Sequence, residues 1–226
     1  MAERGGATSL VVPVKEFVRA KTRLAGASAA VPATDPRAAH ADLALALATD
    51  TLAAVLASAV RRLVVVTSEP RLIAPGAAVV VGDPRVELVA DPGRGLDAAI
   101  RAGAEHLGTT PVGVLLADLP ALRAAELDEA LAAARAALRH APAAFVADHT
   151  GEGTSLLVAG PGFVPRFGPH SAAAHAAAGA VALAGAWPGL RHDVDVPGDL
   201  DEVRALGVGP ATRAWPGLAT VAAGCR

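Results

Sequence analysis

The chain has few of the residues that build disulfides, cysteine-based metal cages or stacking surfaces. Of its 226 residues, one is cysteine and none is tyrosine, and aromatic residues make up 3%. The single cysteine, Cys225, excludes an internal disulfide and a zinc site made of several cysteines, and we assign it no chemical role. A net charge of −2 and the scarcity of aromatics give no reason to bind a nucleic acid polymer, so we expect no such partner.

Long uninterrupted apolar runs are also missing. Hydrophobic residues make up 53% of the chain, but much of that is alanine. No run reaches the roughly eighteen residues of a membrane span without a polar interruption. Residues 1–10 contain one arginine and no apolar segment of signal-peptide type. We therefore expect a cytoplasmic protein with no membrane association, long enough to bury the core of one domain.

Lysine is scarce as well. Lys15 and Lys21 are the only lysines among twenty basic residues, and both lie in PVKEFVRAKTRLA, which also contains Arg23. The excess of alanine, glycine and arginine is typical of a GC-rich coding background, which favours arginine where either base serves. Two lysines in one segment therefore indicate a specific role there. The alternative is a solvated basic turn.

Apolar runs of strand length alternate with segments of helical periodicity up to about residue 140. Asp35 as an N-cap and Pro36 at the first helical position predict the start of a long helix. A glycine-containing loop opens into another helix near Leu96. The strands are expected at SLVVPV, RLVVVTS, AAVVVGD, VELVAD and VGVLLADLP, the last of which ends at Asp118. This alternation is typical of a parallel α/β sheet.

The pattern changes after Pro142. Two strand-like runs, AAFVAD and TSLLVAG, are separated by HTGEG, which favours a hairpin and therefore a mixed sheet. The remaining segments are a helical start at SAAAHAAAGAVALAGA, a strand at LRHDVDV and a short closing helix at GDLDEVRAL. We expect a single Rossmann-like α/β domain with a mixed, mostly parallel sheet over residues 9–206, and a loosely specified C-terminal tail over residues 207–226.

Three aspartates are expected to meet at one edge of this sheet. Alternate side chains of a strand share a face, which places Asp193 and Asp195 about 7 Å apart with Val194 pointing the other way. Asp118 ends a strand at the carboxyl edge, where open α/β folds bind ligands. Oxygen ligands of this kind favour Mg²⁺ shared with substrate phosphates, as in nucleotidyl transfer with two metals. The alternative is that Asp193 and Asp195 decorate a solvated strand end.

The other acids of this segment are interpreted as cap, first-turn or surface acids of the closing helix. They are Asp199, Asp201 and Glu202.

Two loops have residues suited to an anion. In HTGEGTSLL, Gly151 and Gly153 allow backbone N–H groups to approach an anion, and Thr154 adds a hydroxyl donor. In RFGPHSAAAH, Ser171 is a natural N-cap and Gly168 permits close approach in front of a helix N-terminus. The alternatives are a tight hairpin for the first loop and a plain helix cap for the second.

Taken in order, five segments resemble the phosphoenolpyruvate/2-phospho-L-lactate guanylyltransferases of coenzyme F-420 biosynthesis. They are PVKEFVRAKTRLA, LLADLPAL, ADHTGEGTSLL, RFGPHSAAAH and WPGLRHDVDVPGDL, and the resemblance runs from about Leu10 to beyond Leu206. It implies a nucleotide-diphospho-sugar-transferase-like fold. It also implies transfer of GMP from GTP to phosphoenolpyruvate, with 2-phospho-L-lactate or 3-phosphoglycerate as alternative acceptors and pyrophosphate as the second product.

The resemblance implies roles for particular residues. Two Mg²⁺ ions would be held by Asp118, Asp193 and Asp195. The phosphate or carboxylate of the acceptor would be bound at Thr154, Gly168 and Ser171. The GTP phosphates and the catalytic centre would be contacted by Lys15, Lys21 and Arg23. The chain departs from the family at Asp97, where the family usually has asparagine, and we assign Asp97 as a guanine or ribose contact.

The acceptor phosphate is already an anionic nucleophile, so the reaction needs positioning and charge neutralisation rather than a general base. We therefore assign no base among His149, His170 and His192. A transferase of CMP or UMP to a sugar, or of a molybdopterin nucleotide, would have a glycine-rich loop after the first strand, and PVKEFVRAKTRLA has no glycine. A regulatory domain that binds GTP without turnover stays open, as do the choice of acceptor and the oligomeric state.

Overall fold

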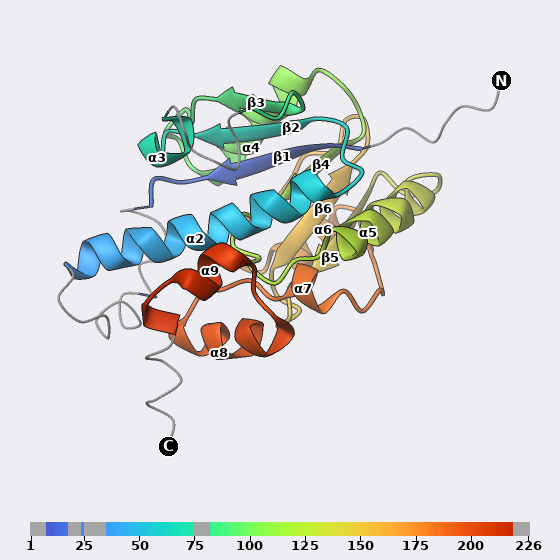
Figure 1. Cartoon of the computed structure of the whole chain (residues 1–226). Coiled ribbons are helices and arrows are strands. Elements are labelled where there is room, and N and C mark those ends of the chain that lie inside the picture. Colours follow the sequence, from blue (N-terminus) through green and yellow to red (C-terminus); the bar gives the residue numbers. More distant parts are fainter. Residues whose placement is uncertain (1–7, 18–23, 25–34, 75–81, 219–226) are drawn as a thin grey trace.

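A computed structural model describes residues 8–17, 24, 35–74 and 82–218. In this part of the chain a seven-stranded sheet has the order β3-β2-β1-β4-β6-β5-β7 (Figure 1). Its strands are β1 (Ser9–Val14), β2 (Leu63–Thr67), β3 (Val86–Val89), β4 (Val112–Leu115), β5 (Ala143–Ala147), β6 (Thr154–Ala159) and β7 (Val181–Ala182). The β1–β2, β1–β4, β2–β3 and β5–β7 pairs are parallel, and β6 is antiparallel to β4 and β5. The predicted mixed, mostly parallel α/β sheet is confirmed.

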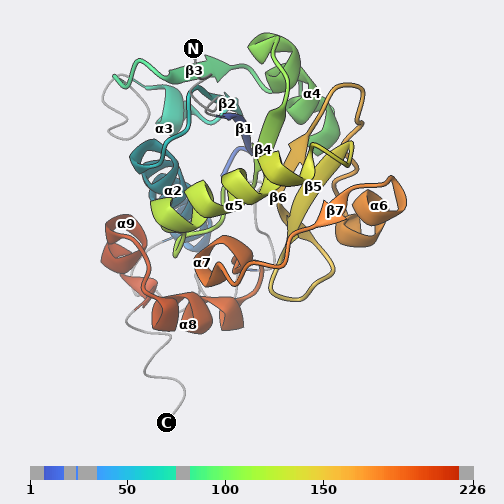
Figure 2. The ribbon, with the colours of Figure 1, turned by 90° about the vertical axis from the view of Figure 1, so that its right-hand side faces the viewer.

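Helices cover both faces of the sheet, which explains why its central strands are mostly continuous apolar runs. On one face Leu10 and Val12 pack with α2 (Pro36–Ala57) and α5 (Ala124–Ala137). On the other face Val11 packs with α4 (Leu96–Leu107), and α6 (Ser171–Ala177) lies against β5 and β7. Figure 2 shows these two helical layers on opposite sides of the strands.

Helix α2 begins as the sequence predicts. Asp35 is its N-cap, and the Asp35 carboxylate accepts the Arg37 backbone N–H at 3.1 Å. The helix is long and apolar enough to cross a membrane by length and composition alone, but 67% of its most apolar window is buried inside the molecule. The buried core helix of a soluble protein meets the same two criteria, and here the apolar residues of α2 pack on β1 and α9.

The predicted strand at LRHDVDV is wrong. Residues Pro188–Arg191 form the short helix α7, and the chain then runs without sheet pairing to α8 (Pro197–Leu206). Proline at the first helical position favours the turn. The Arg191 guanidinium donates to the carbonyl oxygens of Ala147 and Leu183, so a side chain ties this segment to the sheet in place of a strand ladder.

One predicted strand ends earlier than expected, and most of another lies outside the described residues. Strand β4 ends at Leu115 rather than at Asp118, so the aspartate lies in the loop that follows the strand. Most of the predicted strand AAVVVGD falls in residues 75–81, outside the described residues. The short helix α3 (Pro70–Ile73) precedes that gap.

Residues beyond 206 also contribute to the packing. Helix α9 (Pro210–Ala214) lies beside α2, and the Asp50 carboxylate accepts the backbone N–H groups of Ala211 and Thr212 at 3.0 and 2.8 Å. Trp215 and Leu218 are buried in the same apolar cluster as Leu43 and Leu47 of α2. The division of the chain at residue 206 stays a prediction.

Candidate active site

The structure brings the three predicted metal ligands together. One carboxylate oxygen from each of Asp118, Asp193 and Asp195 lies within 4.8 Å of the others. Asp193 is 8% exposed, Asp118 is half-buried and Asp195 is exposed, so the cluster spans the rim between protein and solvent. The two segments are joined directly, because the Val194 N–H donates to the Asp118 carbonyl oxygen at 3.1 Å.

A hydroxyl group of α2 holds the loop that carries Asp118. Thr51 Oγ1 accepts the Leu119 N–H at 2.9 Å and donates to the carbonyl oxygens of Leu47 and Ala117 at 2.9 and 3.2 Å. Thr51 is fully buried, and its bonds to Leu47 and Leu119 are shielded from solvent, whereas the bond to Ala117 is partly buried. The position of Asp118 is therefore set by a helix far away in the sequence.

The acid predicted to serve α8 holds the other segment. Asp199 Oδ2 accepts the backbone N–H groups of Asp195 and Val196 at 2.7 and 2.8 Å, which confirms its assignment as a first-turn capping acid. These bonds turn the chain between Asp193 and α8. In this way a structural carboxylate orders the backbone that presents Asp193 and Asp195.

The donor set fits a hard divalent cation. Three carboxylates within 4.8 Å repel one another unless a positive charge lies between them. Carboxylate oxygens without nitrogen or sulfur donors favour Mg²⁺ over Zn²⁺ or Cu²⁺. Partial exposure of the cluster leaves room for water and for phosphate oxygens, which Mg²⁺ usually retains as ligands.

A stacked pair of histidines borders the carboxylates. The rings of His149 and His192 are 4.1 Å apart at an interplanar angle of 10°. His149 Nδ1 lies 3.5 Å from Asp193 Oδ1, and His192 Nε2 lies 2.6 Å from Glu202 Oε2. One ligand atom from each of His149, His192 and Glu202 lies within 4.8 Å of the others, so these residues form a second group that could hold a metal ion. These histidines were predicted not to act as a base, and their stacking was not predicted, although His192 directly precedes Asp193.

The loop between β5 and β6 forms hydrogen bonds within itself. The Asp148 carboxylate accepts the backbone N–H groups of Glu152 and Gly153 at 3.2 and 2.8 Å, and the Gly151 N–H donates to the Asp148 carbonyl oxygen. Gly153 lies so close to Asp148 that any Cβ there would collide with the carboxylate. These N–H groups are not available to an anion, so the tight-hairpin alternative holds for Gly151 and Gly153.

Thr154, Gly168 and Ser171 lie on three neighbouring segments. Thr154 begins β6, and because β6 is antiparallel to β4, Thr154 lies at the sheet edge where β4 ends and Asp118 follows. Gly168 has a φ of 138°, which an L side chain rarely adopts, and its carbonyl oxygen accepts the Ser171 N–H at 3.2 Å. Ser171 is the first residue of α6 and is buried. The predicted N-cap at Ser171 is therefore wrong by one position, since His170 is the N-cap and has a left-handed φ of 56°.

The structure describes some of the residues that are predicted to contact the nucleotide. Lys15 is exposed directly after β1, at the same sheet edge as Asp118. Lys21 and Arg23 lie outside the described residues. Asp97 is exposed in the first turn of α4. Glu69, which was not predicted to contribute, has a buried carboxylate that accepts the Phe17 N–H at 2.8 Å and so anchors the chain just after Lys15.

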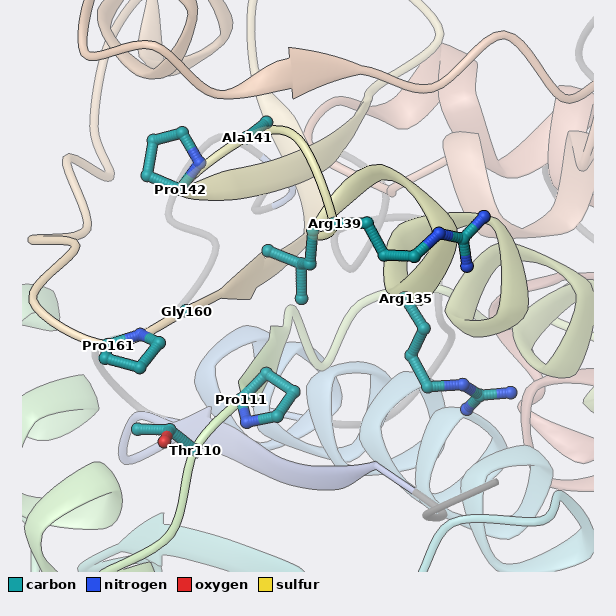
Figure 3. Close-up of a pocket in the computed structure, with 9 residues that line it drawn as sticks. Thr110, Pro111, Arg135, Arg139, Ala141, Pro142, Gly160 and Pro161 are labelled. Atoms are coloured by element: carbon teal, nitrogen blue, oxygen red, sulfur yellow. The ribbon is translucent and has the colours of Figure 1, made fainter. Parts of the chain in front are cut away.

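A cavity of about 500 Å³ lies at the edge of the sheet opposite to the carboxylate cluster. Figure 3 shows Thr110 and Pro111, which precede β4, facing Gly160 and Pro161, which follow β6, with Arg135 of α5 and Arg139, just after that helix, beside them. Since β4 runs away from this edge towards Asp118, the cavity is separate from the carboxylate cluster. It is not the candidate site.

Comparisons with known proteins identify the family of this chain. Residues 46–189 match the MobA-like NTP transferase domain. A phosphoenolpyruvate guanylyltransferase of Geodermatophilus obscurus is 50% identical, with 93% of this chain and 94% of the relative covered. The proteins of the same name from Salinispora arenicola and Mycolicibacterium smegmatis are 47% and 44% identical, covering 96% and 92% of this chain and 96% and 90% of the relatives.

Solved structures support the fold. A protein from Desulfovibrio desulfuricans assigned to the nucleotide-diphospho-sugar transferases superposes with a TM-score of 0.59 at 17% identity, covering 96% of this chain and 94% of the other. A nucleotidyl transferase from Methanothermobacter gives 0.56 at 17% identity over 89% and 97% of the two chains. The resemblance inferred from the sequence is confirmed: the chain belongs to the MobA-like NTP transferases and, among them, to the phosphoenolpyruvate guanylyltransferase family.

Proposed function

We propose that this protein transfers GMP from GTP to phosphoenolpyruvate in the cytoplasm, as a step of coenzyme F-420 biosynthesis. The products are enolpyruvoyl-2-diphospho-5'-guanosine and pyrophosphate. The observation that carries the proposal is the convergence of Asp118, Asp193 and Asp195 within 4.8 Å, in a chain 44–50% identical to relatives named phosphoenolpyruvate guanylyltransferase.

The reaction requires little covalent chemistry from the protein. An oxygen of the acceptor phosphate attacks the α-phosphorus of GTP, a new P–O bond forms, and the bond to the β-phosphate breaks to release pyrophosphate. Both reactants are anions, so catalysis consists of aligning them and offsetting their charge. Mg²⁺ held by Asp118, Asp193 and Asp195, as two ions in the proposed site, supplies positive charge to the triphosphate.

The remaining predicted residues divide between the two substrates. Lys15, Lys21 and Arg23 are proposed to contact the GTP phosphates, and Asp97 the guanine or ribose. Thr154, Gly168 and Ser171 are proposed to bind the phosphate or carboxylate of the acceptor. The positions of the three acceptor residues support this proposal. Thr154 and Asp118 lie at the same edge of the sheet, and the Ser171 N–H is hydrogen-bonded to the Gly168 carbonyl oxygen.

A pyrophosphate-release assay tests the proposal. The purified protein is incubated with Mg²⁺ and each combination of GTP, ATP or CTP with phosphoenolpyruvate, 2-phospho-L-lactate or 3-phosphoglycerate. Release is expected to be fastest with GTP and phosphoenolpyruvate. Faster release with 2-phospho-L-lactate would reassign the acceptor, while calorimetric GTP binding without release in any combination would contradict the enzymatic function.

A further inference from the structure

The chain contains one fully buried histidine that none of the proposed roles uses. His175 lies in α6 and is 0% exposed. Its ring is packed against Phe145, Phe163 and Phe167, with ring centroids 5.9, 6.2 and 5.1 Å away. The chain has only four phenylalanines, so three of them surround this imidazole. Packing against three phenylalanine rings restricts the position of the His175 imidazole and determines which charge state is favoured.

Hydrogen bonds determine which nitrogen of His175 carries the proton. The backbone N–H of Arg166 donates to His175 Nε2 at 2.9 Å, and a backbone amide cannot accept. Nε2 is therefore unprotonated. In a neutral imidazole the proton must then be on Nδ1, which lies 3.0 Å from Thr154 Oγ1. Burial favours the neutral form and lowers the pKa of His175 to about 4, with Arg166 also lowering it and Asp97 opposing the shift.

This tautomer fixes the direction of the Thr154 hydroxyl. Because Nδ1–H donates to Thr154 Oγ1, the hydroxyl accepts at that side and its own hydrogen is directed elsewhere. Thr154 is 2% exposed, so water competes little for that hydrogen. A hydroxyl held as a donor is what an anionic group requires, since phosphate and carboxylate oxygens only accept.

The same imidazole joins the three segments that carry the proposed acceptor contacts. Nδ1 reaches the first residue of β6, Nε2 holds the loop two residues before Gly168, and His175 itself lies one helical turn after Ser171. The Ala172 N–H donates to the Glu152 carbonyl oxygen at 3.0 Å, which ties α6 to the loop before Thr154. His175 is therefore the common partner of Thr154 and the Gly168 loop.

We propose that His175 is a positioning residue of the acceptor site: its Nδ1–H holds the Thr154 hydroxyl as a hydrogen-bond donor to the acceptor anion, and its Nε2 holds the Gly168 loop in place. The inference rests on the proposed function, because it assigns the acceptor to Thr154. His175 contacts no reacting atom and acts through its two hydrogen bonds.

Substitutions can separate the two bonds. His175→Gln places an oxygen near the position of Nε2, so it can accept from Arg166 while losing the donor to Thr154. Phosphoenolpyruvate KM is expected to rise about 10- to 100-fold, with GTP KM and kcat within about 2-fold. His175→Asn places an amide N–H near the position of Nδ1, and we expect it to keep phosphoenolpyruvate KM closer to wild type although asparagine is the smaller residue.

A double-mutant cycle tests whether His175 acts through Thr154. Thr154→Val removes the hydroxyl and is expected to raise phosphoenolpyruvate KM as much as His175→Gln, with no further rise in the double variant. His140→Gln, at an exposed histidine, is the matched control and should behave as wild type. Additive effects of the two substitutions, or unchanged KM in His175→Gln, would overturn the inference.

Nitrogen-15 NMR of the histidine rings gives a readout that does not depend on turnover. His175 is expected to remain neutral with the proton on Nδ1 at pH 7, and a proton on Nε2 would overturn the inference. If wild-type protein shows no turnover of GTP with phosphoenolpyruvate, the proposed function fails. If it turns over normally and His175→Gln does too, only the role of His175 fails.

Discussion

At the scale of single residues, the site depends on carboxylates with two different tasks. Asp118, Asp193 and Asp195 present oxygens to a common point, while Asp199 satisfies backbone N–H groups beside them. All are aspartates, and only the three-dimensional arrangement separates ligands from caps. The distinction matters for mutagenesis, since loss of a ligand changes metal binding and loss of the cap changes the backbone.

Asp195→Asn should abolish most turnover by removing one charge from the metal cluster. We expect a fall in kcat of about 100- to 1,000-fold, comparable to removal of one charge-stabilising group in other active sites. Wild-type protein should also gain thermal stability on addition of Mg²⁺, and the variant should gain less. Asp201→Asn, an exposed acid of α8 outside the cluster, is the control. Near-normal pyrophosphate release by Asp195→Asn would contradict the metal assignment.

His175 should make stability fall in acid. Its folded-state pKa is lowered to about 4, so protons bind first to the unfolded chain as the pH drops below about 6.5, and the stabilisation present above that pH is lost between about 6.5 and 4. The loss amounts to about 2 kcal/mol at pH 5 and about 3 kcal/mol when complete. Urea unfolding of wild-type protein and His175→Phe at pH 7 and pH 5 measures it. An equal pH dependence in both proteins would show that His175 is not the source.

At the scale of elements, the position of the site depends on how α2 meets the loop after β4. Thr51 is buried in the middle of an otherwise apolar helix face, and its hydroxyl satisfies both the Leu119 N–H and the Ala117 carbonyl on either side of Asp118. The hydroxyl satisfies loop backbone groups that no neighbouring strand satisfies. Helix α2 thereby links the core to the cluster of Asp118, Asp193 and Asp195.

Thr51→Val should destabilise the fold and loosen the Asp118 loop. The substitution preserves shape but leaves the buried Leu119 N–H and the partly buried Ala117 carbonyl without their partner, at a cost of about 1–3 kcal/mol. The Mg²⁺ concentration that gives half-maximal activity should rise. Thr51→Ser keeps the hydroxyl and should retain most of the activity. Urea unfolding and Mg²⁺ titration are the measurements, and identical curves for Thr51→Val and wild type would exclude this role.

At the scale of the whole molecule, the C-terminal segment closes the core around α2. Asp50 caps the backbone of α9, and Trp215 and Leu218 are buried against α2. The apolar face of α2 is therefore divided between the sheet and this segment. The composition of residues 207–218, with its glycines and prolines, resembles a linker, but its apolar side chains match a surface that only the folded helix presents.

Truncation after Leu206 should therefore destabilise the protein. Burial of one tryptophan and one leucine contributes about 3–6 kcal/mol, and the loss would expose Leu43 and Leu47. Thermal unfolding should show a clear drop in Tm for the truncated chain, and Trp215→Phe should lower it less. If the truncated protein unfolds at the wild-type temperature, the division of the chain at residue 206 is a true domain boundary.

The sequence by itself determined the α/β class, most strands and the identity of the family. Buried parallel strands are continuous apolar runs, and helices carry start signals such as Asp35 followed by Pro36, so these features are local and can be read without a structure. The same holds for the candidate aspartates, whose spacing and position after apolar runs are visible in the chain.

Only the tertiary structure decided the backbone conformation around Asp193 and the protonated nitrogen of His175. The segment around Asp193 looks like a strand in sequence, but the Arg191 guanidinium, the Asp199 carboxylate and the Asp118 carbonyl oxygen form its hydrogen bonds in place of a strand ladder. The tautomer of His175 follows from a backbone N–H nine residues away and a threonine on another element. Such assignments depend on contacts between distant residues, whose chemistry a linear pattern does not encode.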